Sequence, residues 1–160
     1  MSEHFEAFKP MGVGLLNDAF NNFILGEKLG SGIDREVYVF LPDPDQVIKI
    51  EIGQGNYQNV MELQTWHAAN TAFGDCAFLK KYLAQVFHIS PYGCWLRMER
   101  TWPPPVSYKW PEKMPTALTD LKRSNFGLTK KGRLVCHDYG TNMLMDHGLS
   151  RRMRKADWWD

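Results

Sequence analysis

The sequence has 160 residues, 44% hydrophobic and 13% aromatic, so it can form one compact domain, whether undivided or split into two lobes, but not a multidomain array. Its 19 Lys and Arg side chains nearly balance its 18 Asp and Glu side chains, giving a formal net charge of +1. This balance argues against a protein whose affinity comes from coating nucleic acid or a membrane surface. We therefore expect neither nucleic acid nor a membrane as a partner.

The cysteines indicate the cellular compartment. Cys76, Cys94 and Cys136 contain no Cys-x-x-Cys pair, and their odd number leaves at least one thiol unpaired, as is typical of a reducing setting. The first ten residues have no apolar core, and no apolar run approaches the roughly 20 residues that a membrane span needs. We expect a cytoplasmic protein.

A glycine pair precedes the first clear strand signals. Gly30 and Gly32, followed by Val37, form the pattern G-x-G-x-x-R-x-V. Glycines let the backbone approach an anion with its N–H groups free, although most Gly-Ser-Gly segments are only tight turns. Residues 37–40 and 47–52 then predict two adjacent antiparallel strands, joined by the turn-forming residues 42–45.

The second of these strands carries a lysine. Alternation places Val47 and Lys49 on one face and the isoleucines at positions 48, 50 and 52 on the other. If the isoleucines face the core, Lys49 can point into a cleft on the opposite side. The alternative is an ordinary solvated strand lysine.

Residues 56–72 favour a helix, because they include no proline or internal glycine and Gly74 follows as a stop. At 3.6 residues per turn, Glu62 falls in line with Trp66, Ala69 and Phe73, so a carboxylate would be buried and would need a cation. The alternative places Glu62 in solvent and buries the other stripe, which consists of Val60, Leu63 and His67. The pattern does not decide between the two.

Three consecutive prolines at 103–105 exclude a helix and stiffen the chain. We therefore expect residues 101–106 to be an extended connector between a first lobe (1–100) and a reduced second lobe (107–160). The second lobe shows few signs of long helices. It contains a loop-like stretch at 119–127, a short strand at 133–136 and a basic cluster at 151–155, followed by Trp158 and Trp159.

Two acidic segments in the second lobe carry candidate ligands. Asp120 and Asn125 lie five positions apart, and Asp138 comes two residues before Gly140. Carboxylate and amide oxygens are suited to Mg²⁺, and a further Asp can orient a nucleophilic hydroxyl. Taken singly, each segment also fits a simple Asx or Asp-x-Gly turn.

Taken in order, these residues resemble the protein-kinase-like superfamily, and the texture is similar to that of short phage-encoded kinase-like proteins. The resemblance extends over roughly residues 25–140. The matching positions are Gly30, Gly32, Val37, Lys49, Glu62, Asp120, Leu121, Lys122, Asn125, Asp138 and Gly140.

The resemblance implies an α+β fold, a minimal kinase-like domain with an antiparallel sheet and one main helix in the first lobe. It also implies ATP and Mg²⁺ as cofactors and transfer of the γ-phosphate to a hydroxyl. The implied roles are as follows: Gly30 and Gly32 cover the phosphates; Val37 and Val47 line the adenine slot; Lys49 contacts phosphates and pairs with Glu62; residues 98–101 form the hinge; Asp120 is the base; Lys122 contacts the γ-phosphate; Asn125 and Asp138 hold Mg²⁺.

Departures from the family pattern keep a second hypothesis open. Arg35 occupies the third glycine position, and the chain continues only to Asp160 after Gly140, without the segments that dock a protein substrate. The alternative is a catalytically inactive, pseudokinase-type interaction protein that binds and inhibits a host factor, with the Trp158-Trp159 tail as its contact surface. The tail also fits a solvated helix end whose tryptophans pack on the domain. If the protein is phage-encoded, its compartment is the host cytoplasm.

Overall fold

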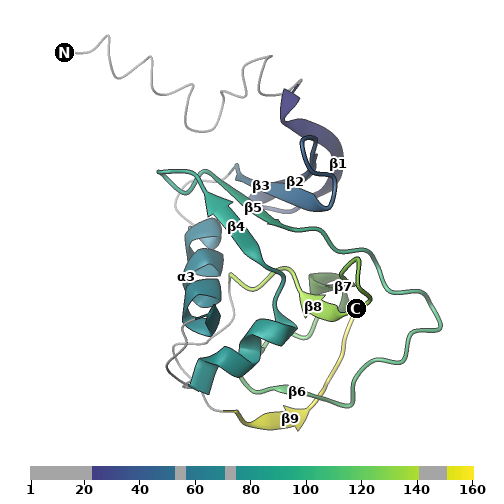
Figure 1. Cartoon of the computed structure of the whole chain (residues 1–160). Helices are drawn as coiled ribbons and strands as arrows, with labels where there is room; N and C mark the ends of the chain where they lie inside the picture. Colours follow the sequence, from purple (N-terminus) through teal and green to yellow (C-terminus); the bar gives the residue numbers. More distant parts are fainter. Residues whose placement is uncertain (1–22, 53–56, 71–74, 141–150) are drawn as a thin grey trace. The chain divides into compact units, whose positions relative to one another are not determined.

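The computed structural model describes residues 23–52, 57–70, 75–140 and 151–160. The fold is α+β, with a five-stranded antiparallel sheet and one main helix (Figure 1). The chain divides into two compact units. The sheet unit comprises Met1–Asn59 and Phe87–Arg100, and the second unit comprises Val60–Val86 and Thr101–Asp160. The chain therefore passes from one unit to the other just before the three prolines.

The sheet has the strand order β1-β2-β3-β5-β4. Its strands are β1 (Leu25–Ser31), β2 (Arg35–Phe40), β3 (Gln46–Glu51), β4 (Val86–Ile89) and β5 (Trp95–Glu99). The expected antiparallel pairing of the second and third strands is confirmed, and the turn between them is closed by Asp43, which accepts hydrogen bonds from the Asp45 amide and the Gln46 side chain.

The isoleucine face of β3 forms the core of the sheet unit, as alternation predicts. Ile48 and Ile50 are buried with Leu25, and four partly buried apolar side chains pack against this cluster. Ile52 differs, because it follows the end of β3 and 43% of its surface is exposed. Burying apolar side chains from β1 and β3 stabilises the pairing of β1, β2 and β3.

The main helix, α3, spans Gln58–Asn70 and begins at an anchor on the sheet. The Asn59 amide donates to the Glu51 carboxylate at 2.6 Å, and the Asn59 side chain donates to the carbonyl oxygens of Lys49 (3.3 Å) and Gly93 (2.9 Å). Satisfying an orphan N–H in the first turn favours a helix start at this point. Because all these groups belong to the sheet unit, the start of α3 is fixed relative to β3.

The structure decides between the two helix faces that the sequence left open. Glu62 is fully buried, and Trp66 and Ala69 on the same stripe are buried too. Of the competing stripe, Val60 and Leu63 are half-buried and His67 is exposed. The reading that embeds a carboxylate in an apolar stripe is therefore correct; Phe73, its fourth expected member, and Gly74, the expected stop, lie outside the described residues.

The second unit contains two small two-stranded sheets (Figure 1). Strand β6 (Lys113–Pro115) pairs with β9 (Met153–Lys155), and β7 (Phe126–Leu128) pairs with β8 (Leu134–Cys136). Two 3₁₀ segments, η2 (Asp75–Tyr82) and η3 (Arg123–Asn125), complete the described elements. The expected strand near 133–136 is confirmed, whereas the helix end envisaged for the basic cluster is wrong, because residues 153–155 pair as a strand.

The described part of the chain is poor in long helices, and α3 has 13 residues. After the prolines, the described residues contain only the three-residue turn η3 as helical structure, which confirms that expectation there. Among the helices described, none combines the length and apolarity that crossing a membrane requires. Cys94 and Cys136 are free thiols.

Candidate functional site

The sheet unit aligns three of the candidate residues in one row. Gly30 on β1 pairs with Val37 on β2, and Val37 pairs with Lys49 on β3. Directly opposed residues in antiparallel strands project to the same face, so Val37 and Lys49 share a face with the Gly30 backbone beside them. Two inter-strand steps separate Gly30 from Lys49, about 10 Å. Val47, two residues before Lys49, belongs to this face as well.

The described surroundings of Gly30 and Gly32 leave room for a larger side chain at both positions. A Cβ added at Gly30 would meet no atom of the described residues within 4 Å, and one added at Gly32 would lie 3.8 Å from the Arg35 carbonyl oxygen. Gly32 donates its N–H to that same oxygen at 2.8 Å, which closes the β1–β2 turn. The space above Gly30 is therefore open to a ligand that approaches the backbone.

A network of charged and polar side chains links β1 to β2 next to the glycines. Lys28 pairs with Glu36, whose other oxygen accepts a hydrogen bond from the Tyr38 hydroxyl at 2.7 Å. The hydrogen bond from Lys28, followed by that from Tyr38, lowers the pKa of Glu36, and the Glu36 carboxylate raises the pKa of both partners. The network spans the register shifts of β1 between Leu25 and Gly30, where irregular pairing would otherwise weaken the hairpin.

Lys49 is buried, with only 3% of its surface exposed, so the solvated strand lysine is excluded. Its strand neighbours Val47, Ile48 and Ile50 are buried as well. A buried ammonium is costly to hold unless it is paired, and Lys49 does have an interaction partner in the structure. Its pairing with Glu62, a residue of the other unit, stays a prediction.

The second unit organises the segment from Asp120 to Asn125 as a closed loop. One Asp120 oxygen accepts the Asn125 side-chain N–H at 2.8 Å, and the other accepts the Lys122 amide at 3.3 Å. The Asn125 amide donates to the Lys122 carbonyl at 2.9 Å. Because the side-chain nitrogen of Asn125 donates a hydrogen bond to Asp120, the side-chain oxygen of Asn125 is the atom that can act as a ligand.

His137 ties this loop to the segment that carries Asp138. Its backbone N–H donates to the Asn125 carbonyl at 2.9 Å, and its ring Nε2 lies 3.0 Å from the Ser124 carbonyl oxygen. A carbonyl accepts only, so Nε2 carries the proton and Nδ1 accepts from the Thr101 hydroxyl at 2.8 Å. Both ring nitrogens thus take part in hydrogen bonds. The backbone of Asn125 is bonded to His137, the residue that directly precedes Asp138.

Glu62 lies beside the segment that follows Asp138. Its Oε1 accepts the Tyr139 amide at 3.3 Å, and the Tyr139 hydroxyl donates to the Ala84 carbonyl at 2.8 Å. Tyr139 and Ala84 are both fully buried, and the Ala84 amide donates to the Cys136 carbonyl. The second unit therefore brings Glu62, Asp138 and the Asp120 loop into one hydrogen-bonded network.

Gly127 has a steric reason to be glycine. A Cβ there would lie 2.6 Å from the Thr101 hydroxyl oxygen and 3.0 Å from the Trp102 carbonyl oxygen. Trp102 and Leu128 exchange backbone hydrogen bonds of 2.8 and 2.9 Å, which hold the backbone at 101–102 close to that at 127–128. The close approach holds Thr101 in reach of His137.

The kinase-like resemblance implies a Mg²⁺ ion held by the side chains of Asn125 and Asp138. Among the residues described, no group of three or more His, Cys, Asp or Glu side chains could hold a metal ion. Mg²⁺ does not require such a cage, because it is commonly bound by one or two side chains together with substrate phosphates. Asn125 and Asp138 carry hard oxygen donors of this kind, and their role as Mg²⁺ ligands stays a prediction.

No protein-family model matches the chain, and neither does any curated protein.

Sequence reasoning missed His137 and Thr101 as organising residues. The kinase-like pattern assigns no role to His137, and its hydrogen bonds to Thr101 and Ser124 give it one. The available signal was the position of His137 immediately before Asp138. Its partner Thr101 lies 36 positions away, and nothing in the local pattern connects the two.

Proposed function

We propose that this protein binds ATP with Mg²⁺ and transfers the γ-phosphate to a hydroxyl group. The observation that carries the proposal is the network of the second unit, in which Asp120, Asn125 and the Asp138 segment are joined through His137. These residues occur in the order in which protein kinases use a base, an amide ligand and a carboxylate ligand.

A strand of the sheet unit and the α3 portion of the second unit supply further support. Lys49 lies on the third strand and Glu62 on the helix that follows, where the kinase signature has its lysine and glutamate. The row of Gly30, Val37 and Lys49 supports the binding of a molecule with a phosphate end and an apolar ring.

The assigned roles follow from the chemistry of each side chain. Lys49 would neutralise charge on the phosphates, and Asn125 and Asp138 would hold Mg²⁺, which supplies positive charge to the phosphate oxygens when bound. The acceptor hydroxyl oxygen forms a bond to the γ-phosphorus as the bond from that phosphorus to the bridging oxygen of ADP breaks. Asp120 would take the hydroxyl proton, because an ionised carboxylate is a proton acceptor and its position in the loop matches that of the base in the kinase signature.

Thermal unfolding with and without ATP·Mg²⁺ tests the binding step. Ligand at about 100 times its Kd stabilises the folded state by roughly 2.7 kcal/mol, which raises Tm by about 5–11 °C for a chain of this size. Lys49→Met should reduce the shift, whereas Lys113→Met, at an exposed position of β6, should leave it unchanged. A Tm that does not respond to ATP·Mg²⁺ in the wild type would contradict the proposal.

A pair of glycine substitutions separates binding from folding. Gly30→Ala should leave the free energy of unfolding within about 0.5 kcal/mol of wild type, because the added methyl meets nothing, yet weaken ATP binding. Gly132→Ala should do the reverse, costing about 1 kcal/mol through its φ of 77° while leaving ATP affinity unchanged. Urea unfolding and calorimetric titration measure the two quantities. Equal ATP affinity in Gly30→Ala and wild type would argue against a ligand at this glycine.

The second hypothesis is the inactive interaction protein, which would use the Trp158-Trp159 tail as its contact surface. In the structure, the two tryptophans differ in their surroundings. Trp158 packs inside the second unit, with its ring centroid 4.6 Å from that of Trp110 and 4.9 Å from that of Phe126. Only Trp159, 49% exposed, remains as an exposed aromatic of the tail. ATP binding without phosphate transfer would favour this hypothesis over the enzyme.

A further inference from the structure

The last residues of the chain pair with the Asp120 loop. The Trp159 amide donates to the Leu121 carbonyl at 3.3 Å, and the Arg123 amide donates to the Trp159 carbonyl at 2.8 Å, so Trp159 pairs in parallel with Lys122. Arg123 also forms an ion pair with Asp160 at 2.8 Å. All these groups belong to the second unit. A single parallel β-bridge therefore joins the tail to the loop that carries the candidate base.

This pairing places an aromatic ring against the ammonium of Lys122. Bridged residues project to the same face, and the Lys122 Nζ lies 5.1 Å from the centroid of the Trp159 ring. A cation at this distance is attracted to the ring, and its flexible stem loses rotamer freedom when it lies there. Lys122 is thereby held in one region while its ammonium keeps donors to spare for another partner.

Trp158 fixes the tail at the preceding position. Its indole N–H donates to the Pro111 carbonyl at 2.8 Å, and its ring packs between Trp110 and Phe126. Phe126 directly follows Asn125, so the anchor of the tail touches the same stretch of chain as the candidate site. The position of the Trp159 ring is thus tied to the Asp120 loop on both sides.

We propose that Trp159 is a positioning residue that orients Lys122 toward the γ-phosphate of ATP. The inference rests on the proposed function and adds a role for the tail within it. Trp159 touches no substrate and acts through Lys122. Because only ATP has a γ-phosphate, the orientation of Lys122 affects the preference for ATP over ADP and leaves the affinity for ADP unchanged.

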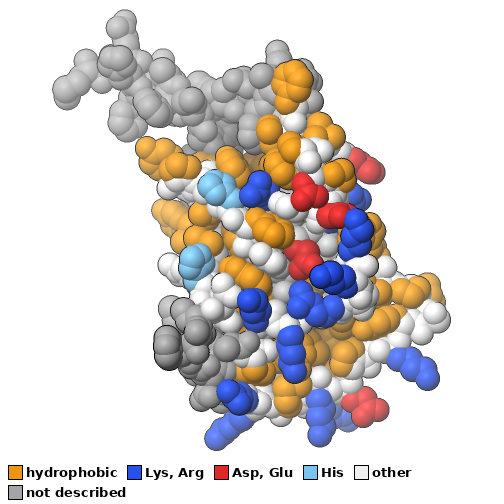
Figure 2. All heavy atoms as spheres, in the orientation of Figure 1, with side chains coloured by type: hydrophobic (Ala, Val, Ile, Leu, Met, Phe, Trp, Pro, Cys, Tyr) orange, Lys and Arg blue, Asp and Glu red, His pale blue; other side chains and the backbone are white. Residues whose placement is uncertain are grey.

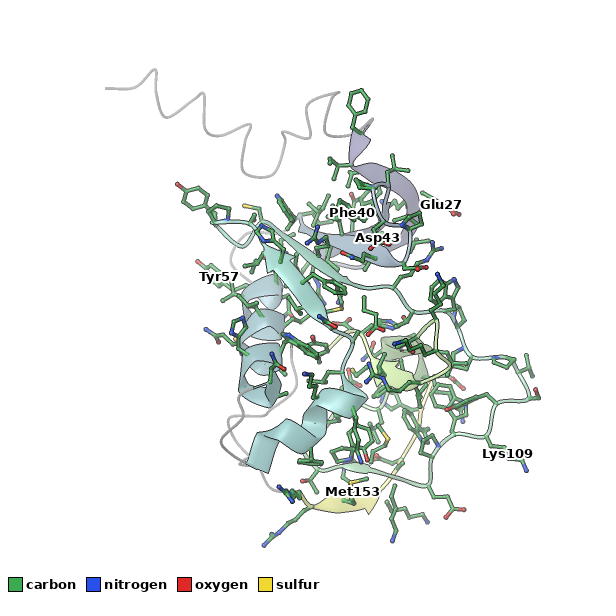
Figure 3. All side chains as sticks on the ribbon, in the orientation of Figure 1. Glu27, Phe40, Asp43, Tyr57, Lys109 and Met153 are labelled. Carbon is green, nitrogen blue, oxygen red and sulfur yellow. The ribbon has the colours of Figure 1, made fainter. Side chains whose placement is uncertain are left out.

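Calorimetric titration of the full chain with ATP and with ADP, both with Mg²⁺, tests this role. Trp159→Ala should lower ATP affinity roughly two- to fivefold, the range of one cation–π contact, while ADP affinity stays at the wild-type value. Trp159→Phe keeps an aromatic face and should retain most of the preference, which guards against a folding failure. Met153→Ala is the control, because Met153 is an exposed side chain on β9 (Figure 3), in the same described segment as Trp159.

The outcomes separate the two proposals. An equal loss of ATP and ADP affinity in Trp159→Ala, or no loss at all, overturns the positioning role while the proposed function stands. A wild-type protein that binds neither nucleotide overturns the proposed function and the positioning role together. A selective loss for ATP that Lys122→Ala reproduces, with no further loss in the double variant, supports the role.

Discussion

If the proposed function holds, Asp138→Asn should lower phosphate transfer by about two orders of magnitude or more, because the substitution removes the negative charge of the proposed Mg²⁺ ligand and keeps the shape of the side chain. Both neighbours of Asp138 are held by hydrogen bonds of their own, which the substitution leaves in place. His137 is held by Thr101 and Ser124, and the Tyr139 amide is held by Glu62. Incubation with γ-labelled ATP and a cell lysate, followed by quantification of labelled product, measures the effect.

The matched control is Glu112→Gln, which makes the same change from carboxylate to amide at an exposed position of the second unit. It should label product as well as wild type does. Equal labelling by Asp138→Asn and wild type would assign the transfer to a contaminating kinase and defeat the enzyme hypothesis. Absence of labelling by the wild type would leave nucleotide binding alone to be explained, as in a pseudokinase.

Local patterns were sufficient for much of the sheet unit. Alternation in β3 predicted its isoleucine face, and the turn residues at 42–45 predicted the pairing of β2 with β3, because both signals depend on neighbours in sequence. Helical periodicity placed Glu62 on a stripe with Trp66 and Ala69 but could not choose between that stripe and its competitor. The choice depends on what packs against α3, which periodicity does not contain.

Long-range pairing could not be predicted in the same way. The row of Gly30, Val37 and Lys49 depends on strand register, which is fixed by the bulges of β1 and the Lys28–Glu36 pair. The basic cluster offered a second example. Most of its residues are exposed, in the region of β6 and β9 where Lys and Arg gather on the surface in Figure 2. Its strand, Met153–Lys155, forms by pairing with residues about 40 positions earlier.

The tail shows the same limit. Trp158 and Trp159 are adjacent in sequence and equally apolar, yet one packs between two aromatic rings and the other is half-exposed over Lys122. Composition could indicate only an aromatic tail. Its division into an anchor and a ring that restrains a lysine follows from the extended pairing with residues 121–123, in which successive side chains project to opposite faces.

Tyr139→Ala should lower the free energy of unfolding by roughly 3–5 kcal/mol, the usual cost of truncating a fully buried aromatic side chain. The Tyr139 hydroxyl donates to the carbonyl of Ala84, and both residues are fully buried. Tyr139→Phe keeps the ring and removes only that donor, so it should cost about 1–2 kcal/mol.

Urea unfolding at 25 °C measures both costs, with Tyr92 as the matched control. The Tyr92 side chain is 82% exposed in the turn between β4 and β5, so Tyr92→Ala and Tyr92→Phe should both stay within about 0.5 kcal/mol of wild type. If Tyr139→Phe is as stable as wild type, the hydroxyl does not satisfy the Ala84 carbonyl and the tyrosine has no structural reason at this position. If the graded loss appears instead, the segment after Asp138 is anchored by a bond that phenylalanine cannot make, and the network joining Glu62 to Asp138 depends on it.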